Sequence, residues 1–278
     1  TGGDALVAVA ICFLPFLFGF LVSGALFAVM ASDYAHLFAS PRYLDFMWNS
    51  LTVAAVAALV TVSAAILIGF RARTKPSRSS SFILVGTGLG YAVPGGVIAI
   101  GLMVPMAAFD NALDAFMEAR FGIDTGLLIT GSIWLMVAAY MVRFLAVALN
   151  SYDSGMATIP AHFDAIGRTL GQPGHKLLLR VHLPVARASV LTALLIVFVD
   201  VMKELPATLI LHPFNFQTLA VQAHRLAADE RLFEAAVPSL VLVAFGLIPV
   251  LILCGSLGRD SRRSAASPRP ASAVARRA

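Results

Sequence analysis

The chain has 278 residues, of which 59% are hydrophobic and 13% charged, and its mean hydropathy is +0.86. Soluble domains are roughly 45–50% apolar and about 25% charged, so this composition excludes an ordinary soluble domain. The net charge of +5 is confined to one end, because residues 259–278 contain six arginines and one aspartate. This Ser-, Pro- and Ala-rich segment is predicted to be a disordered cytoplasmic tail that faces lipid, and it does not indicate nucleic-acid binding.

Six apolar runs are each long enough to cross a bilayer as a helix, which takes about 20 residues. They cover residues 5–30, 48–70, 82–109, 126–149, 187–211 and 234–255. The predicted fold class is therefore an all-α polytopic membrane protein with six transmembrane helices in one domain, residues 1–258. The run 5–30 lacks the basic flank of a signal peptide and is interpreted as a true span. Because the sequence begins at Thr1 and not at Met, we expect a fragment of a longer chain.

Basic residues are distributed unevenly between the loops. Residues 71–81, residues 150–187 and the tail together hold 14 of the 20 lysines and arginines. The loop 110–125, which would lie on the opposite side, is acidic and contains Asp110, Asp114, Glu118 and Asp124. Loops rich in Lys and Arg stay in the cytoplasm, so both termini and the segment 150–187 are predicted to be cytoplasmic.

The segment 159–184 is amphipathic although long apolar runs flank it. One predicted helical face carries Ile159, Phe163, Ile166 and Leu170, spaced four, three and four apart. Asp164 and Arg168 form an i,i+4 pair on another face of the same helix. This helix could lie on the lipid headgroups, or it could be presented to a groove in a soluble partner. A second short helix is predicted over 175–182.

Three ionisable residues lie inside the fifth apolar run. The spacing of Asp200, Lys203 and Glu204 predicts that they share one helical face, and Pro206 is predicted to break or kink the helix. Charged groups at this depth usually face a bundle interior or an aqueous cavity. They could form a translocation path or gate, or a network that only neutralises itself and holds helices together. No metal site is predicted, because Lys203 competes for the carboxylate oxygens.

The remaining polar and helix-breaking residues give weaker indications of function. Pro94, Gly95 and Gly96 could form a hinge in the third run, or could allow a neighbouring helix to pack closely. Arg143 is predicted to snorkel to the cytoplasmic interface from the inner end of the fourth run. The histidines have no paired-ligand spacing, and the sequence contains neither a nucleophile set nor a Gly-rich phosphate loop. We therefore predict no catalytic residue, no ATP hydrolysis by this chain and no bound cofactor.

The segment 159–184 resembles the cytoplasmic loop of permease subunits of ATP-binding-cassette (ABC) importers, whose pattern is E-A-A-x3-G-x9-I-x-L-P. Here Gly171 is followed by nine residues and then by Val181, His182, Leu183 and Pro184. The E-A-A positions are occupied by Ala165, Ile166 and Gly167, with Asp164 one place earlier.

Four further stretches extend the resemblance over nearly the whole chain. They are WNSLTVAAVAALVT (48–61), GYAVPGGVIAIGL (90–102), VDVMKELPATLIL (199–211) and FNFQTLAVQAHRLAADERLFEAAVPSL (214–240). The last two are similar to the subgroup that imports ferric iron, in which two six-helix halves are often fused, and this chain resembles the second half. Closely similar permeases take thiamine, phosphonates or other small polar solutes.

The resemblance implies a type I importer permease of the bacterial inner membrane that moves a substrate without covalent chemistry. Its implied partners are a separate ATPase that binds ATP, a periplasmic binding protein on the outer loops 31–47, 110–125 and 212–233, and a second permease half or homodimer mate. The implied ATPase-coupling residues are Phe163, Asp164, Ala165, Ile166, Gly167, Arg168, Leu170, Gly171, Leu183 and Pro184. The expected path or gate residues are Asp200, Lys203, Glu204, Pro206, Pro94, Gly95 and Gly96.

Two other classes of function are weighed against this one. A gradient-driven secondary transporter or channel would account for the cluster Asp200, Lys203 and Glu204, but it leaves the helix in 159–184 without a purpose. A membrane-embedded enzyme would need a His/Asp constellation at a membrane face, which the sequence does not offer.

Overall fold

The computed structural model describes residues 2–157, residue 160 and residues 174–266. These ranges contain helices, turns and bends but no strand. Six of the described helical stretches are long and apolar enough to cross a membrane: Val7–Ser32, Pro41–Thr74, Gly95–Phe121, Ile133–Met156, Gly174–Met202 and Leu232–Ile252. The predicted fold class, an all-α chain with six membrane helices, is confirmed.

The elements follow one another in chain order. The first half contains α1 (Gly2–Phe16), a π-helical turn η1 (Leu17–Val22), α2 (Ser23–Ser32), a 3-10 turn η2 (Ala35–Ala39), α3 (Pro41–Thr74), α4 (Arg78–Ala92) and α5 (Gly95–Phe121). The second half contains α6 (Ile133–Met156), α8 (Gly174–Leu177), a π-helical turn η3 (Leu178–His182), α9 (Leu183–Met202), α10 (Pro206–Leu211), α11 (Leu219–Ala228) and α12 (Leu232–Ala266).

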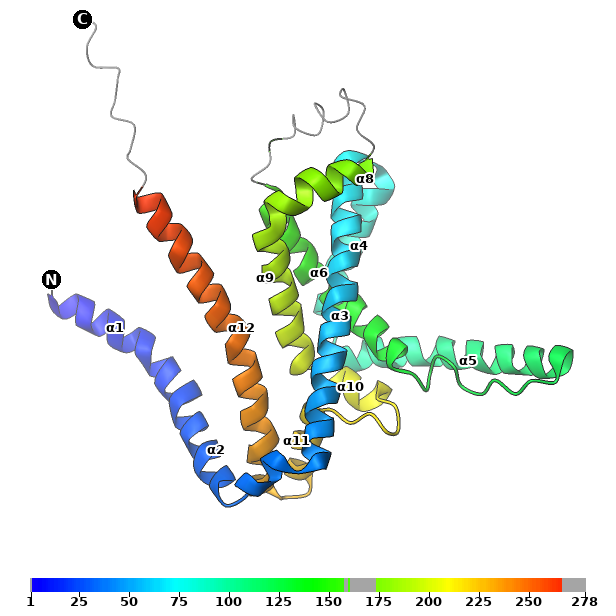
Figure 1. Ribbon diagram of the computed structural model, residues 1–278, viewed down its shortest axis with the longest axis horizontal. Helices are drawn as coiled ribbons and strands as arrows, with labels where there is room; N and C mark the ends of the chain where they lie inside the picture. The colour runs from blue at the N-terminus through cyan, green and yellow to red at the C-terminus, as the bar shows by residue number, and fades with distance from the viewer. Residues whose placement is uncertain (1, 158–159, 161–173, 267–278) are drawn as a thin grey trace, which may run out of the picture.

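The core is formed where α3, α6 and α9 pack side by side (Figure 1). Many of its buried residues are small: Ala54, Ala57 and Ala65 on α3, Ala139 and Ala148 on α6, and Ala193 on α9. Membrane helices gain stability from close van der Waals packing, and small side chains let their backbones approach. A Cβ at Gly69 would come within 2.8 Å of the Tyr152 ring, and one at Gly90 would collide with the Val142 carbonyl.

The first and last spans stand apart from this core. Figure 1 shows the α1–α2 span and α12 diverging from α9. Helix α2 packs against α12 where the C-terminal end of α2 lies beside the N-terminal part of α12. The most apolar stretch of Val7–Ser32 buries none of its residues within the chain. Several of its large side chains are more than half exposed, among them Val7, Val9, Ile11, Phe18 and Leu26. This apolar surface needs lipid or another protein to cover it.

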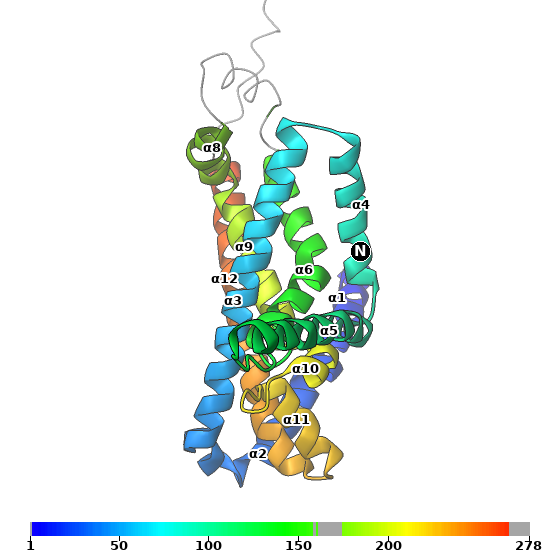
Figure 2. The ribbon, with the colours of Figure 1, turned by 90° about the vertical axis from the view of Figure 1, so that its right-hand side faces the viewer.

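The third predicted run, 82–109, is divided between two helices at the Pro94–Gly95 position. Helix α4 ends at Ala92, and α5 starts at Gly95 and runs almost perpendicular to α3 in both views (Figures 1 and 2). Pro94 has no N–H to continue the helical hydrogen bonds of α4, so the chain turns here. Its carbonyl accepts the first hydrogen bonds of α5, from Val97 N (3.0 Å) and Ile98 N (3.2 Å).

The prediction of a separate helix over 175–182 is wrong. The helix continues from α8 through η3 into α9, past Leu183 and Pro184, and bends at η3 (Figure 1). Pro184 removes a hydrogen bond to the carbonyl four residues earlier, and the wider π turn directly before it accommodates that loss.

Two other predictions concern the edges of the described residues. Helix α12 runs to Ala266, so residues 259–266 of the predicted disordered tail are helical. The residues of the predicted docking helix lie outside the described part of the chain: Phe163, Asp164, Ala165, Ile166, Gly167, Arg168, Leu170 and Gly171. Their role in ATPase coupling stays a prediction.

Candidate functional site: two helix breaks joined by an ion pair

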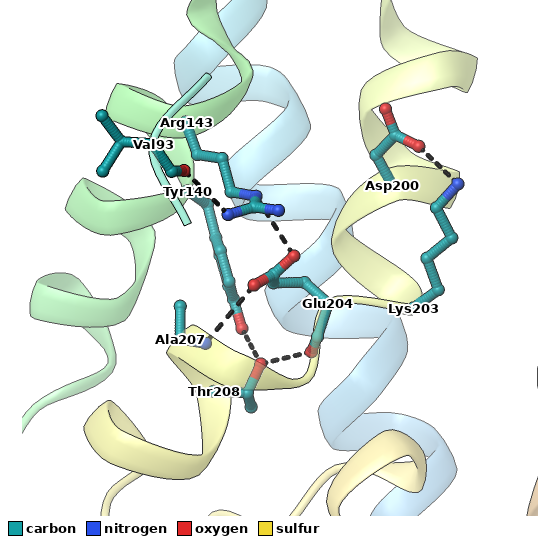
Figure 3. A network of polar contacts seen from close by, with 8 residues as sticks. All are labelled: Val93, Tyr140, Arg143, Asp200, Lys203, Glu204, Ala207 and Thr208. Carbon is teal, nitrogen blue, oxygen red and sulfur yellow. Dashed lines mark hydrogen bonds and ion pairs between the residues drawn. The ribbon is translucent and has the colours of Figure 1, made fainter. Parts of the chain in front are cut away.

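Two helices of the membrane domain are broken, and the breaks lie close together (Figure 3). The first break is Val93–Pro94, between α4 and α5. The second is Lys203–Leu205, between α9 and α10, directly before Pro206. The predicted break at Pro206 is confirmed. Each break leaves backbone polar groups without helical partners, which is costly away from water unless other groups satisfy them.

Arg143 of α6 reaches the first break. Its Nη1 donates to the carbonyl oxygen of Val93 at 3.3 Å, at the C-terminal end of α4. A guanidinium is favourable at this position, because the helix dipole and the unsatisfied carbonyls make a helix C-terminus negative. Arg143 therefore stabilises the end of α4 both as a donor and as a positive charge.

Glu204 occupies the second break. Its Oε1 accepts from the backbone N–H of Ala207 at 3.3 Å, in the first turn of α10. A carboxylate satisfies an orphan donor at a helix N-terminus. The backbone carbonyl of Glu204 also accepts a hydrogen bond from the Thr208 hydroxyl. Glu204 and Arg143 thus place opposite charges on opposite kinds of helix end.

The two charges also meet each other. Arg143 Nε lies 3.2 Å from Glu204 Oε2, in an ion pair that lacks the alignment of a full hydrogen bond. The Glu204 side chain is only 7% exposed and that of Arg143 22%. We call this contact, with its links to Val93 and Ala207, the Arg143–Glu204 bridge. It ties the α4–α5 break to the α9–α10 break through α6 (Figure 3).

Gly95 leaves the space that the bridge occupies. A Cβ at Gly95 would stand 2.7 Å from Arg143 Nη1 and well inside the contact distance of Glu204 Oε1. A Cβ at the neighbouring Gly96 would meet only Ile210 Cδ1 at 3.6 Å and Pro206 Cβ at 4.0 Å, which are ordinary contacts. Of the two predicted roles for these glycines, the structure favours close approach, and the approaching group at Gly95 is an ion pair.

A second contact holds α10 against α6. The Tyr140 hydroxyl lies 2.7 Å from Thr208 Oγ1, and both side chains are buried. Tyr140 and Arg143 are three residues apart and so lie on the same face of α6. This face anchors the short α10 helix by one neutral hydrogen bond and one ion pair.

Asp200 and Lys203 form a separate ion pair, with Lys203 Nζ 2.8 Å from Asp200 Oδ1. The Lys203 side chain is 68% exposed, and the pair lies on the far side of the α9 end from Arg143 (Figure 3). The prediction that Asp200, Lys203 and Glu204 share one helical face is wrong, because α9 ends at Met202 and Glu204 follows the break.

The prediction that Arg143 snorkels to the interface is wrong as well, since its guanidinium binds Glu204 and Val93. The sequence analysis also did not identify Tyr140 and Thr208, whose hydroxyl groups join α6 to α10. A usable signal was present: an arginine within a long apolar run is expected to pair with an intramembrane acid.

The acidic segment 110–125 differs from the predicted open loop. Residues up to Phe121 belong to α5, and the chain after it folds back along that helix (Figure 1). Asp110 is buried and accepts hydrogen bonds from Ile129 N, Thr130 N and the Thr130 hydroxyl. Asp114 accepts from the backbone N–H groups of Thr125 (2.7 Å) and Gly126 (3.0 Å).

Replacing Asp110 with alanine is expected to release this return loop from α5. The change leaves two partly buried backbone donors, Ile129 N and Thr130 N, unpaired, at a cost of at most about 1–3 kcal/mol each. Hydrogen exchange at Ile129 and Thr130 should therefore accelerate. Glu118→Ala on the same helix, at an exposed side chain, is the matched control and should leave exchange unchanged. Equal protection in both variants would contradict the role given to Asp110.

Among the described residues, no group of three or more His, Cys, Asp or Glu side chains is placed to hold a metal ion. The polar contacts of the two breaks belong to helix ends and ion pairs. They hold α5 and α10 against α6.

The amino-acid sequence was compared with those of known proteins. No protein-family model matches the chain. It is 26% identical over 212 residues to an Fe(3+)-transport system permease protein of Haemophilus influenzae, covering 76% of this chain and 39% of the relative. It is 23% identical over 209 residues to a putative 2-aminoethylphosphonate transport system permease protein of Salmonella typhimurium, covering 75% of this chain and 73% of that protein.

The fold has a close counterpart among solved structures. A chain of a bacterial alginate ABC transporter, crystallised with an alginate pentasaccharide-bound periplasmic protein, superposes with a TM-score of 0.67. The match covers 96% of this chain and 95% of the other at 14% identity, so it speaks for the fold alone. In sequence and in fold, the chain is like the permease subunits of type I ABC importers, which are multi-pass transport subunits of the bacterial inner membrane and not themselves enzymes.

Proposed function

We propose that this chain is one permease half of an ATP-driven importer of ferric iron. The proposal is carried by the similarity to the Fe(3+)-transport permease over three quarters of this chain. The Salmonella relative, named for 2-aminoethylphosphonate transport, matches over a nearly equal share. A phosphonate is therefore the competing substrate, and the two can be compared directly in transport assays.

In this proposal the two helix breaks form the moving part of the translocation path. Irregular backbone inside a membrane occurs where it is buried in protein or lines a cavity, and broken helices are typical of transporter binding sites. The Asp200–Lys203 pair, of which the Lys203 side chain is exposed, would face the path, while the Arg143–Glu204 bridge would hold α10 and α5 in register with α6. Rocking of one permease half against the other would then move both breaks together.

The partners would bind at three different places. The ATPase would dock on the segment 159–184, and the second permease half or a second copy would cover the exposed α1–α2 span. The binding protein would dock on the loops 31–47 and 212–233 and the outer part of 110–125. Phe214, at 99% exposure, is an apolar anchor in the second of these loops.

Paired variants test the docking sites against each other. The membrane-inserted chain is purified with ATPase subunits and with a periplasmic binding protein encoded in the same genome. Ile166→Asp with Leu170→Asp is expected to abolish capture of the ATPase and to leave capture of the binding protein intact. Phe214→Asp is expected to do the reverse, because it lies in a different loop.

Each variant is thus the control for the other. Loss of both partners in both variants would indicate misfolding, which a thermal unfolding midpoint in detergent would reveal. A correctly inserted wild-type chain that captures no ATPase, but shows gradient-driven flux when reconstituted alone, would replace the importer by a secondary transporter or channel.

A further inference from the structure

A cleft lies between the C-terminal end of α3 and the first turns of α4. Its volume is about 240 Å³, and it is lined by Leu67, Ile68, Arg71, Ala72, Ser80 and Ile83. Leu67 is 61% exposed and Ile83 47%, so the cleft is open on the outside of the bundle. Figure 2 shows α3 and α4 standing apart below the short connection that joins them.

The cleft is apolar along its length and basic at one end. Leu67, Ile68 and Ile83 form its walls, and Arg71 stands where the chain turns toward α4. Exposed Lys75 and Arg78 follow in the same turn, and residues 71–81 contain no acid. Arg73 does not contribute, because its Nη1 donates to the Met156 carbonyl at 2.7 Å, toward α6.

Arg71 retains donors for an anion. Its Nη1 donates to the Lys75 carbonyl at 2.7 Å, which fixes the guanidinium at the end of the cleft. A guanidinium has five N–H donors in a planar fork, so those not used in this bond suit the oxygens of a phosphate. The arginine is thereby positioned before any ligand arrives.

Helix α4 packs against α6 on one side but only weakly against α3. None of its residues is buried, although 82–92 belongs to an apolar run. An occupant of the cleft must therefore be apolar over most of its length and anionic at the end next to Arg71. A phospholipid with an anionic headgroup has this combination, and basic pockets between membrane helices are known to bind such headgroups.

We propose that the α3–α4 cleft binds an anionic phospholipid, with one acyl chain between Leu67 and Ile83 and the phosphate on Arg71. Lys75 and Arg78 add positive charge around the headgroup. The lipid supplies packing on the side of α4 that faces the cleft and so joins α3 to α4. This site is independent of the substrate and of the ATPase.

The test measures lipid retention by native mass spectrometry of the full chain released from detergent containing phosphatidylglycerol or phosphatidylcholine. Wild type is expected to retain phosphatidylglycerol preferentially. Arg71→Gln with Arg78→Gln is expected to lower retention by about fivefold for each arginine removed. Arg225→Gln, an exposed arginine on α11, is the matched control and should retain the lipid as wild type does.

Two further experiments distinguish the contribution of the lipid's acyl chain from that of its headgroup. Ile83→Trp narrows the cleft while leaving all charges in place, and it is expected to reduce retention of phosphatidylglycerol. Inorganic phosphate at millimolar concentration is expected not to displace the lipid, because it offers no acyl chain. Equal retention of the two lipids, unchanged retention in Arg71→Gln with Arg78→Gln, displacement by phosphate, or a second copy of the chain in place of lipid would each overturn the proposal.

Discussion

Replacing Glu204 with glutamine is expected to destabilise the folded chain by about 3–5 kcal/mol, because it leaves Arg143 largely buried without its counter-charge. Glutamine keeps a side-chain oxygen for the Ala207 N–H, so the loss comes from the charge and not from the capping bond. Both helix breaks should loosen together, since the bridge links them. The measurement is the free energy of unfolding in detergent, with transport in proteoliposomes as the second readout.

A double-mutant cycle separates this effect from general damage. Arg143→Met alone should be as harmful as Glu204→Gln, whereas the two combined should cost much less than their sum, because the unpaired charge is gone. Asp200→Asn is the matched control for stability alone: the Lys203 ammonium that it leaves unpaired is 68% exposed, so the free energy of unfolding should fall by at most about 1 kcal/mol. Strictly additive losses from Arg143 and Glu204 would show that they are not coupled.

Gly95→Ala is expected to disturb the same bridge from the side of α5. The new methyl group would lie against the Arg143 guanidinium and the Glu204 carboxylate, and overpacking of this kind typically costs about 1–3 kcal/mol. Because the ion pair must separate to make room, transport should fall together with stability. The measurements are the unfolding midpoint and the initial rate of uptake.

Gly96→Ala provides the comparison at the next residue of the same helix. Its added methyl meets Ile210 and Pro206 only at ordinary contact distances, so stability and uptake should stay close to wild type. If Gly95→Ala and Gly96→Ala changed stability and uptake equally, the effect would come from replacing any glycine at the start of α5. The close approach of the ion pair to Gly95 would then not be its cause.

The sequence predicts the number of spans and the position of the second break well. Both predictions depend on local properties, namely the length of apolar runs and the missing N–H of Pro206. The partner of Glu204 is not local, because Arg143 lies on another helix and the two meet only once α6 has packed against α10. Lys203, the neighbour in sequence, was the obvious candidate partner and pairs with Asp200 instead.

The misplacement of Arg143 has a traceable cause. The apolar residues Leu127, Leu128 and Ile129 suggest a span from 126 to 149, which would put Arg143 near its inner end. These residues belong to the loop that hydrogen bonds to Asp110 and Asp114, and α6 runs from Ile133 to Met156. Arg143 therefore lies near the middle of α6, where it needs a counter-ion. Hydropathy does not reveal a loop held by side chains of the preceding helix.

The most direct test of the central claim is ATP-driven uptake of radiolabelled ferric iron into proteoliposomes. They would contain this chain, its second permease half or second copy, the ATPase and the binding protein. Uptake is expected to require ATP and the binding protein, to exceed uptake of 2-aminoethylphosphonate, and to be lost in Glu204→Gln while the ATPase stays bound. Uptake that proceeds without ATP or the ATPase, or that is unchanged in Glu204→Gln, would contradict the account.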